Sequence, residues 1–595
     1  MKKYSCFFLL FALLFAACLG KKPLTKRLFY EKIVIDFGMQ NPELISFVEP
    51  PLLDRFWHYK AKLTPVSPEF EAKMADKIAE KTKILESYNS KNSSPQKQLS
   101  YDIMHWFLQN ETEGNAFLYY NYPVNQLHGI QSETPSLMIS THSVKNLRDV
   151  KSYLSRLKAF DKKFAETIEG MEKRRGMGII PPTFVLKKVI SQMKDFISTP
   201  AKENALYISL KEKMEKAHFS PKKQAKWLQI TAISIEKEVY PAYQKLIDYC
   251  EKLLPQSTTE DGVWKFPNGK AYYAHALKTH TTTNLSADEI HEIGLVEVAR
   301  LEKEAQKILD SLGIRGKTVG ESLANLAKKS NFLYPNTAEG RNQCLKDYQT
   351  LIDSVYIKIP LFFDVQPKSK VKVLRVPVFK EKTAPGAYYE PPSLGGKRPG
   401  IFYANLRSLA EIPTWSMATL AFHEAVPGHH FQIGIQQELK QVPTFRKVLP
   451  FTAYMEGWAL YAEYLAVEMG AHKDAYSLLG YYQAQLFRAV RLVVDTGIHE
   501  KKWTREQAIT YMLAHTGMPE NDVVAEIERY IVDPGQACAY KIGQLKILEL
   551  RKKAQVALGN RFSMKEFHHL LLTNGAMPLE VMEKVVESYI QAKKG

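Results

Sequence analysis

Apolar residues recur every three or four positions over most of the chain, a pattern typical of amphipathic helices. Short breaks rich in Pro, Gly or Asn separate these segments. Ser286 followed by Glu289 has the form of a capping box, which marks a helix start. The pattern predicts helices over Leu28–Tyr88 with an interruption at Pro50-Pro51, and over Leu147–Glu169, Thr183–Ile197, Pro221–Leu254 and Ser286–Leu312.

The pattern changes between Val355 and Asn405. Val371–Val378 is rich in β-branched residues, and Ile401–Tyr403 follows a loop rich in Gly and Pro. These segments predict a small sheet of two to four strands. Helical periodicity returns at Thr414 and continues to the end of the chain. The predicted fold class is therefore mainly α, with one small β-sheet immediately before a helix that carries several histidines.

Composition fits a globular protein with a large core, because 45% of the residues are hydrophobic and 24% are charged. The net charge is +18, but the basic residues are spread along the chain and form no recognisable module, so we expect no nucleic-acid partner. The cysteines outside the leader are far apart, which argues against a disulfide framework or a Cys-zinc site.

The N-terminus has the form of a bacterial export signal. Two lysines precede an apolar stretch from Cys6 to Phe15, and Ala16-Ala17 then leads to Cys18. Residues 1–17 predict a lipoprotein signal peptide, with Cys18 lipidated as the mature N-terminus. Plain secretion and a retained anchor are the alternatives. We therefore expect an exported protein of the bacterial cell envelope that is held on the membrane by a lipid.

The segment from His423 to His430, HEAVPGHH, combines residues that a zinc hydrolase needs. Neutral imidazoles hold the ion, and a neighbouring carboxylate, here Glu424, takes a proton from water. The common motif is H-E-x-x-H on one helix, but Pro427 occupies the place of the second histidine. If Pro427-Gly428 loops out, His429 takes that place, which we prefer. If the helix continues, His430 is the alternate ligand.

Glu456 is the best candidate for a third ligand. It lies among Met455, Gly457 and Trp458, and a carboxylate in such an apolar setting needs a cation. Gly457 would allow another helix to approach closely. Glu463 lies on the same helical face as Glu456, and we expect it to be solvated.

A polar stripe follows on an otherwise apolar helix, formed by Arg488, Arg491, Asp495 and His499. In one interpretation Arg491 and Asp495 form a buried structural ion pair. In the other, an arginine binds the C-terminal carboxylate of a peptide, while Asp495 and His499 orient a metal ligand from behind.

Further candidates surround the Pro534-Gly535 turn and the end of the predicted sheet. Tyr540 is the first choice to stabilise an oxyanion, although a core tyrosine is an ordinary alternative. Gln536 lies on the same turn and is a candidate for substrate binding. Tyr403 and Asn405 would line the substrate groove, because an edge strand can pair with an extended peptide.

These motifs resemble the bacterial domain-of-unknown-function family eight-eight-five. The resemblance rests on HEAVPGHH, on EGWALYAE at 456–463, and on further segments around Tyr389, Arg398–Asn405, Arg488–His499 and Pro534–Gly543. Members of that family are often lipoproteins and are grouped with zinc peptidases. The family is distantly similar to helical glutamate-zincins such as angiotensin-converting enzyme and carboxypeptidase Taq.

The resemblance implies a large two-lobed helical zincin-like fold, here one domain over residues 18–595 with sub-lobes at roughly 25–270 and 271–595. It implies Zn²⁺ held by His423, His429 and Glu456, with Glu424 as the general base. We expect a zinc-dependent peptidase that hydrolyses peptide substrates. A zinc amidase or carboxypeptidase acting on modified amides, and a metal-free binding lipoprotein on the same scaffold, are the alternatives.

Overall fold

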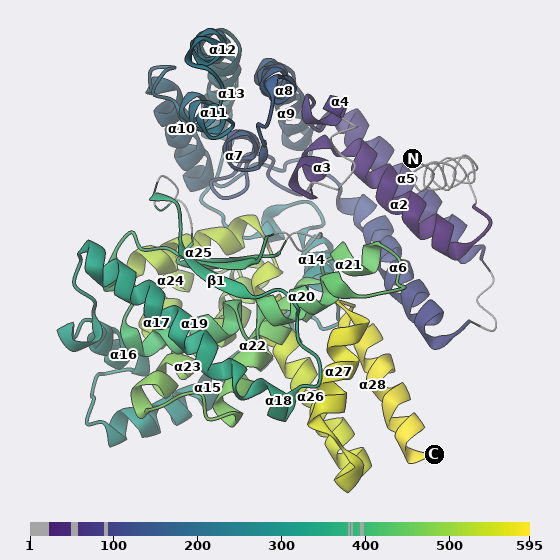
Figure 1. The fold of residues 1–595 in the computed structure, drawn as a ribbon, viewed down its shortest axis with the longest axis vertical. Coiled ribbons are helices and arrows are strands. Elements are labelled where there is room, and N and C mark those ends of the chain that lie inside the picture. The colour runs from purple at the N-terminus through teal and green to yellow at the C-terminus, as the bar shows by residue number, and fades with distance from the viewer. Residues whose placement is uncertain (1–22, 49–56, 89–92, 379–380, 382–384, 393–397) are drawn as a thin grey trace. The chain divides into compact units, whose positions relative to one another are not determined.

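A computed structural model describes residues 23–48, 57–88, 93–378, 381, 385–392 and 398–595 (Figure 1). The leader, Cys18 and the predicted interruption at Pro50-Pro51 lie outside the described residues. The described chain is mainly helical with one small sheet, which confirms the predicted fold class. Among the described helices, none is both long and apolar enough to cross a membrane.

Contacts divide the chain into two compact units. Among the described residues, unit 1 comprises 23–88, 107–260 and 265–267, and unit 2 comprises 93–106, 261–264 and 268–595. The first turns of helix α6 (Pro95–Gly114) therefore belong to unit 2, whereas the predicted sub-lobes placed them before residue 270 with the N-terminal part. The reason is local: Arg446 donates to the Ser100 hydroxyl at 3.0 Å.

Unit 1 is entirely helical in its described part. Beside the later turns of α6, its helices are α2 (Lys26–Gln40), α3 (Pro42–Val48), α4 (Trp57–Lys60), α5 (Pro68–Glu86), α7 (Ile130–Ser136), α8 (Leu147–Lys158), α9 (Phe160–Gly176), α10 (Thr183–Ser198), α11 (Ala205–Lys216), α12 (Pro221–Ser234) and α13 (Tyr240–Leu253). The helix predicted over Leu147–Glu169 is thus two helices, which meet at Ala159. The helix predicted over Pro221–Leu254 contains a wide turn at Ile235–Val239, just before Pro241, whose nitrogen cannot donate a helical hydrogen bond.

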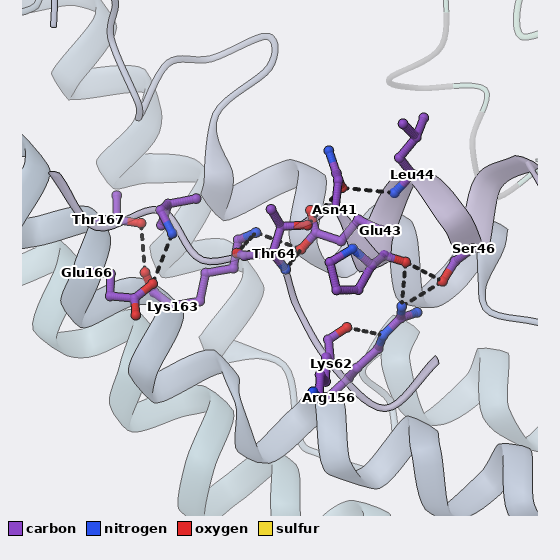
Figure 2. A network of polar contacts seen from close by, with 12 residues as sticks. Asn41, Glu43, Leu44, Ser46, Lys62, Thr64, Arg156, Lys163, Glu166 and Thr167 are labelled. Carbon is purple, nitrogen blue, oxygen red and sulfur yellow. Dashed lines mark hydrogen bonds and ion pairs between the residues drawn. The ribbon is translucent and has the colours of Figure 1, made fainter. Parts of the chain in front are cut away.

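A buried guanidinium fastens the first helices of unit 1 to α8 (Figure 2). Arg156 is fully buried and donates to the Lys62 carbonyl at 2.9 Å and to the Ser46 hydroxyl at 2.6 Å. Lys163 of α9 donates to the Glu43 carboxylate at 2.6 Å. Because these partners satisfy the buried cations, the network explains how unit 1 accommodates charge in its interior.

Unit 2 contains the remaining helices and the sheet. Its helices are α14 (Gly269–Thr281), α15 (Ala287–Ser311), α16 (Val319–Ala327), α17 (Ala338–Tyr356), α18 (Ile359–Phe362), α19 (Met417–Glu424), α20 (His429–Glu438), α21 (Phe445–Val448), α22 (Thr452–Glu468), α23 (Ala475–His499), α24 (Arg505–Thr516), α25 (Glu520–Val532), α26 (Ala539–Leu558), α27 (Met564–Asn574) and α28 (Leu579–Lys594). The predicted capping box at Ser286 is confirmed at the start of α15.

Close helix contacts in unit 2 depend on glycine. A Cβ added to Gly457 of α22 would lie 2.5 Å from the Gly543 Cα of α26. This confirms the predicted close approach at Gly457. Because Glu456 precedes Gly457, the contact fixes the backbone of a candidate metal ligand.

The sheet has three strands in the order β1-β3-β2, with bounds Val371–Arg375, Gly400–Ala404 and Ala387–Glu390 respectively. Strand β1 runs parallel to β3, and β2 runs antiparallel to it. The predicted small sheet is confirmed, but β3, which carries Tyr403, is the central strand. Since both of its edges are paired, the predicted pairing of this strand with a peptide is wrong.

Candidate metal centre

The helix that carries His423 is short. Residues 414–416 form a short turn, α19 ends at Glu424, and α20 begins at His429. Helical periodicity returns at Thr414 in the sequence, but the α-helix itself begins at Met417. The break at Pro427-Gly428 itself is confirmed, because the proline cannot donate the next helical hydrogen bond.

Gly428 permits a tight return of the chain over the end of α19. A Cβ at this position would lie 1.9 Å from the His423 carbonyl oxygen, so only glycine fits. The Trp458 indole N–H donates to the Pro427 carbonyl at 2.9 Å and fastens the break to α22. The four residues between the helices therefore bring His429 back beside His423.

Three side chains from α19, α20 and α22 converge on one point. A ligand atom from each of His423, His429 and Glu456 lies within 4.8 Å of the other two. The Glu456 Oε2 atom is 3.3 Å from His429 Nε2 and 3.6 Å from His423 Nε2. A tetrahedral zinc ion with ligand bonds of about 2.0–2.1 Å would hold its ligand atoms about 3.4 Å apart. The two separations from Glu456 therefore fit a zinc ion at the centre of the three ligands.

Glu456 Oε2 provides a second test of this fit. The atom is buried and has no hydrogen-bond partner among the described residues, although two imidazoles lie nearby. Burial opposes ionisation of this carboxyl, but His429 and His423 outweigh it and hold the Glu456 pKa well below its usual range. An ionised, buried oxygen without a hydrogen bond needs a cation, and a metal ion held by the three ligands would supply it.

His430 lies next to His429 but is engaged elsewhere. Its Nδ1 atom is 3.0 Å from the Tyr389 hydroxyl of β2, and its Nε2 atom is 2.9 Å from the Ser369 carbonyl oxygen. Burial lowers the His430 pKa to about 4, so the ring is neutral at neutral pH. Both ring nitrogens are occupied, and the structure therefore does not place the alternate ligand in the cluster.

His423 forms a hydrogen bond with Glu463 on the side of the ring away from Glu456. The His423 Nδ1 atom is 2.7 Å from Glu463 Oε1, and Glu463 is fully buried. Burial lowers the His423 pKa, but Glu456 and Glu463 outweigh it and raise the value to about 9. The prediction that Glu463 is solvated is therefore wrong. The missed signal was its place seven residues after Glu456, on a helix that is otherwise apolar there.

Glu424 is the last residue of α19 and is separate from the three converging ligands. It is 8% exposed, and no described residue donates a hydrogen bond to its carboxylate. Burial raises the pKa of the Tyr348 phenol in α17, and Cys344 and Glu424 raise it further, which shows that Glu424 lies near this ring. A carboxylate that is neither paired nor bound to the candidate metal ligands can accept a proton from water.

Arg491 and Tyr540 form an aromatic and cationic cluster near Glu456. The Arg491 guanidinium lies 4.0 Å from the centre of the Phe487 ring and 4.4 Å from that of Tyr540. Arg491 donates to the Tyr530 hydroxyl at 2.9 Å and to Glu526 at 3.0 Å. The predicted ion pair between Arg491 and Asp495 is therefore wrong.

Tyr540 is near enough to Glu456 to be affected by its charge. Burial raises the Tyr540 pKa, Glu456 raises it further, and Arg491 lowers it. The phenol is therefore protonated at neutral pH and can donate a hydrogen bond. Gln536 accepts a hydrogen bond from Arg529. A hydrogen bond with Gln536 also lowers the pKa of Tyr540.

Asp495 and His499 lie away from the ligand cluster. The Asp495 carboxylate accepts from the Tyr273 hydroxyl at 2.5 Å and from the Gly535 N–H at 3.0 Å. His499 accepts from the Val263 N–H through Nδ1 and donates to the Tyr530 carbonyl through Nε2. They therefore hold backbone segments in place, and the interpretation in which they orient a metal ligand is wrong.

The remaining predicted substrate residues are spread over unit 2. Tyr403 stacks on Tyr388 with ring centres 5.0 Å apart. The buried Asn405 amide donates to the Glu381 and Pro385 carbonyls, so this side chain holds a loop rather than facing a substrate. Arg488 lies 3.9 Å from Glu463 and therefore contributes to the charge balance behind His423.

Comparison with known proteins identifies a family and two structures of the same fold. Residues 53–586 match the family described as "Bacterial protein of unknown function (DUF885)". A protein from Colwellia psychrerythraea, described as a putative lipoprotein, is 34% identical over 95% of this chain and 99% of its own, with a TM-score of 0.92. A putative lipoprotein of unknown function from Shewanella oneidensis is 16% identical over 94% and 99% of the two chains, with a TM-score of 0.71.

Two further results add no structural argument. A putative oligoendopeptidase F from Bacillus anthracis str. Ames is 12% identical over 94% of this chain and 95% of its own, but its TM-score of 0.30 does not show a common fold. No curated protein matches the sequence.

Proposed function

The chain belongs to the DUF885 family of bacterial proteins, and we propose that it is an exported zinc-dependent peptidase. The observation that carries the proposal is the convergence of His423, His429 and Glu456, in which the Glu456 oxygen lies at tetrahedral-zinc separations from both imidazoles. The unpartnered, buried Glu456 Oε2 atom supports it independently.

Each of these residues would have a separate role in hydrolysis. His423, His429 and Glu456 would hold the ion, which supplies Lewis-acid chemistry when bound. Glu424 accepts a proton from the attacking water and passes it to the nitrogen of the leaving amine. Tyr540 donates a hydrogen bond from its phenol to the oxygen on which negative charge develops.

We also propose that the protein is lipid-anchored in the bacterial cell envelope. The similar Colwellia protein is described as a putative lipoprotein, and this chain carries Ala16-Ala17-Cys18 after an apolar segment. Mass spectrometry of the N-terminal peptide tests this directly. A diacylated Cys18 supports the anchor, and an N-terminus elsewhere contradicts it.

Glu424→Gln tests the assignment of the base. The variant should bind zinc like the wild type, because Glu424 is not a ligand, and should hydrolyse a peptide library about 10²–10⁴-fold more slowly. Zinc content and rates measured on the same preparations separate the two roles. Undiminished hydrolysis by the variant would overturn the role of Glu424. Zinc-dependent cleavage of modified amides, with intact peptides left untouched, would favour the amidase alternative.

Arg491 favours carboxypeptidase action as a second candidate within the same chemistry. Its NH1 group is buried and has no hydrogen-bond partner in the described part of the chain, although Nε and NH2 both have one. The adjacent Tyr540 is within electrostatic reach of Glu456. A carboxylate is the usual partner of a free guanidinium N–H, so the C-terminus of a peptide would satisfy this group.

A further inference from the structure

A chain of four buried side chains runs from His423 into the core of unit 2. Glu463 of α22 accepts from His423 on one oxygen, and its other oxygen accepts from the Gln485 amide of α23 at 2.8 Å. The Gln485 carbonyl oxygen accepts from the Lys541 ammonium of α26 at 2.7 Å. Each of these residues is 3% exposed or less.

Lys541 and Glu463 together determine the direction of the hydrogen bonds in this chain. An ammonium group only donates, so the Gln485 oxygen must face Lys541 and its NH₂ group must face Glu463. An ionised carboxylate only accepts, so His423 must carry its proton on Nδ1. In the neutral ring that a metal ion requires, the lone pair of His423 is then on Nε2, the atom that faces Glu456.

Lys541 is itself held by several partners. It also donates to the Gln544 carbonyl oxygen at 2.8 Å, and Glu297 of α15 lies 3.7 Å away. The Gln544 amide in turn donates to the Leu460 carbonyl of α22 at 2.9 Å. Burial lowers the Lys541 pKa to about 8, so the ammonium form predominates at pH 7. Helices α15, α22 and α26 thus fix the position of one cation.

We infer that Lys541, acting through Gln485 and Glu463, is a positioning residue that sets the affinity of His423 for zinc. Without the ammonium group, the Gln485 carbonyl oxygen loses its donor, so the Gln485 amide is no longer held in place and the hydrogen bond that fixes Glu463 against His423 is weakened. Hydrogen-bond partners of metal-binding histidines typically change metal affinity by about 10–100-fold. The inference rests on the proposed zinc site.

Zinc affinity measured by competition with a coloured chelator tests this inference on the full mature chain. Lys541→Met and Gln485→Met should each weaken zinc binding by about 10–100-fold, because both interrupt the same chain. The double variant should bind zinc no more weakly than the weaker-binding single variant, because both changes interrupt the same chain of hydrogen bonds. The visible spectrum of the cobalt-substituted variants should shift from that of the wild type, because the orientation of His423 changes.

Lys546→Met is the matched control, because Lys546 lies on the same helix and pairs with Glu549 and Glu583 nearer the surface. It should leave both the zinc affinity and the cobalt spectrum unchanged. If Lys541→Met does not fold, Gln485→Met and Glu463→Gln decide the question. Variants that melt at lower temperature but keep wild-type zinc affinity and cobalt spectrum would overturn the inference. A wild-type chain that binds no zinc would instead refute the proposed function.

Discussion

His429 and His430 are adjacent in the chain but face different partners. His429 lies within reach of Glu456, whereas His430 is fixed between Tyr389 and a backbone carbonyl. The sequence left the choice open, because it depends on how the four residues from Ala425 to Gly428 fold. That path is set by tertiary contacts, including the hydrogen bond from Trp458 to the Pro427 carbonyl.

Glu463 shows a second limit of sequence interpretation. A glutamate two turns further along the same helical face as a candidate ligand could face solvent or the core, because its burial depends on which helices cover it. The structure places Gln485 and Lys541 over it, and these residues come from two later helices. Arg491 is similar, because its partners Glu526 and Tyr530 lie on α25 rather than on its own helix.

Arg491 carries a prediction about the substrate. Arg491→Gln should raise KM for peptides that end in a free carboxylate by about tenfold or more, because a charged hydrogen bond is lost. The same peptides with an amidated C-terminus should be cleaved equally by the variant and the wild type. Steady-state kinetics with matched free-acid and amidated peptides measures this. An equal effect on both series would contradict carboxylate recognition.

At the scale of elements, helix pairs and short breaks position the metal centre. The sequence predicted the main helices of both units, the break at Pro427-Gly428 and the small sheet, because these depend on local periodicity and on proline. It did not predict the separation of α8 from α9 or the central position of β3. Those features depend on which neighbouring element packs against each face, which local patterns do not encode.

The contact between α22 and α26 has little tolerance for added volume. Gly457→Ala would place a methyl group 2.5 Å from the Gly543 Cα. Overpacking of this kind costs about 1–3 kcal/mol, which should exceed the roughly 1 kcal/mol that alanine gains in helix propensity. The variant should therefore melt at lower temperature and bind zinc more weakly. Gly176→Ala at the end of α9, where no atom lies within 4 Å, is the control and should not melt earlier. Equal melting temperatures for Gly457→Ala and the wild type would contradict the tight contact.

The buried carboxyl of Asp495, which accepts a hydrogen bond from Gly535, should make the stability of the folded chain depend on pH. Burial raises the Asp495 pKa to about 7, despite hydrogen bonds from Tyr273 and Gly535, against about 3.9 in an unfolded chain. Between these values the folded chain binds more protons than the unfolded chain, so this contribution to stability falls as pH rises and is constant above about pH 7. The total change is on the order of 4 kcal/mol.

Asp495→Asn should remove this dependence. The melting temperature of the wild type minus that of the variant should therefore decrease between about pH 4.5 and about pH 7.5. Thermal denaturation at a series of pH values measures the difference. A difference that stays constant or increases over this range would show that the Asp495 carboxyl is not protonated preferentially in the folded chain.

At the scale of the whole molecule, the described residues form two compact units, and every residue assigned to the candidate metal centre lies in unit 2. The three candidate ligands lie within a stretch from His423 to Glu456, which are 33 positions apart (456 − 423 = 33), so the centre joins segments that are close in sequence. Because a metal that binds only the folded chain stabilises it by mass action, zinc should raise the melting temperature and a chelator should lower it.

Zinc content tests the central claim most directly. The purified mature chain, loaded with zinc and then dialysed, should retain one ion per chain by elemental analysis, and Glu424→Gln should retain the same amount. His423→Ala and Glu456→Ala should lose it, because each removes one of the three ligands. A folded wild-type chain without zinc, or full zinc occupancy in His423→Ala, would contradict the metal centre.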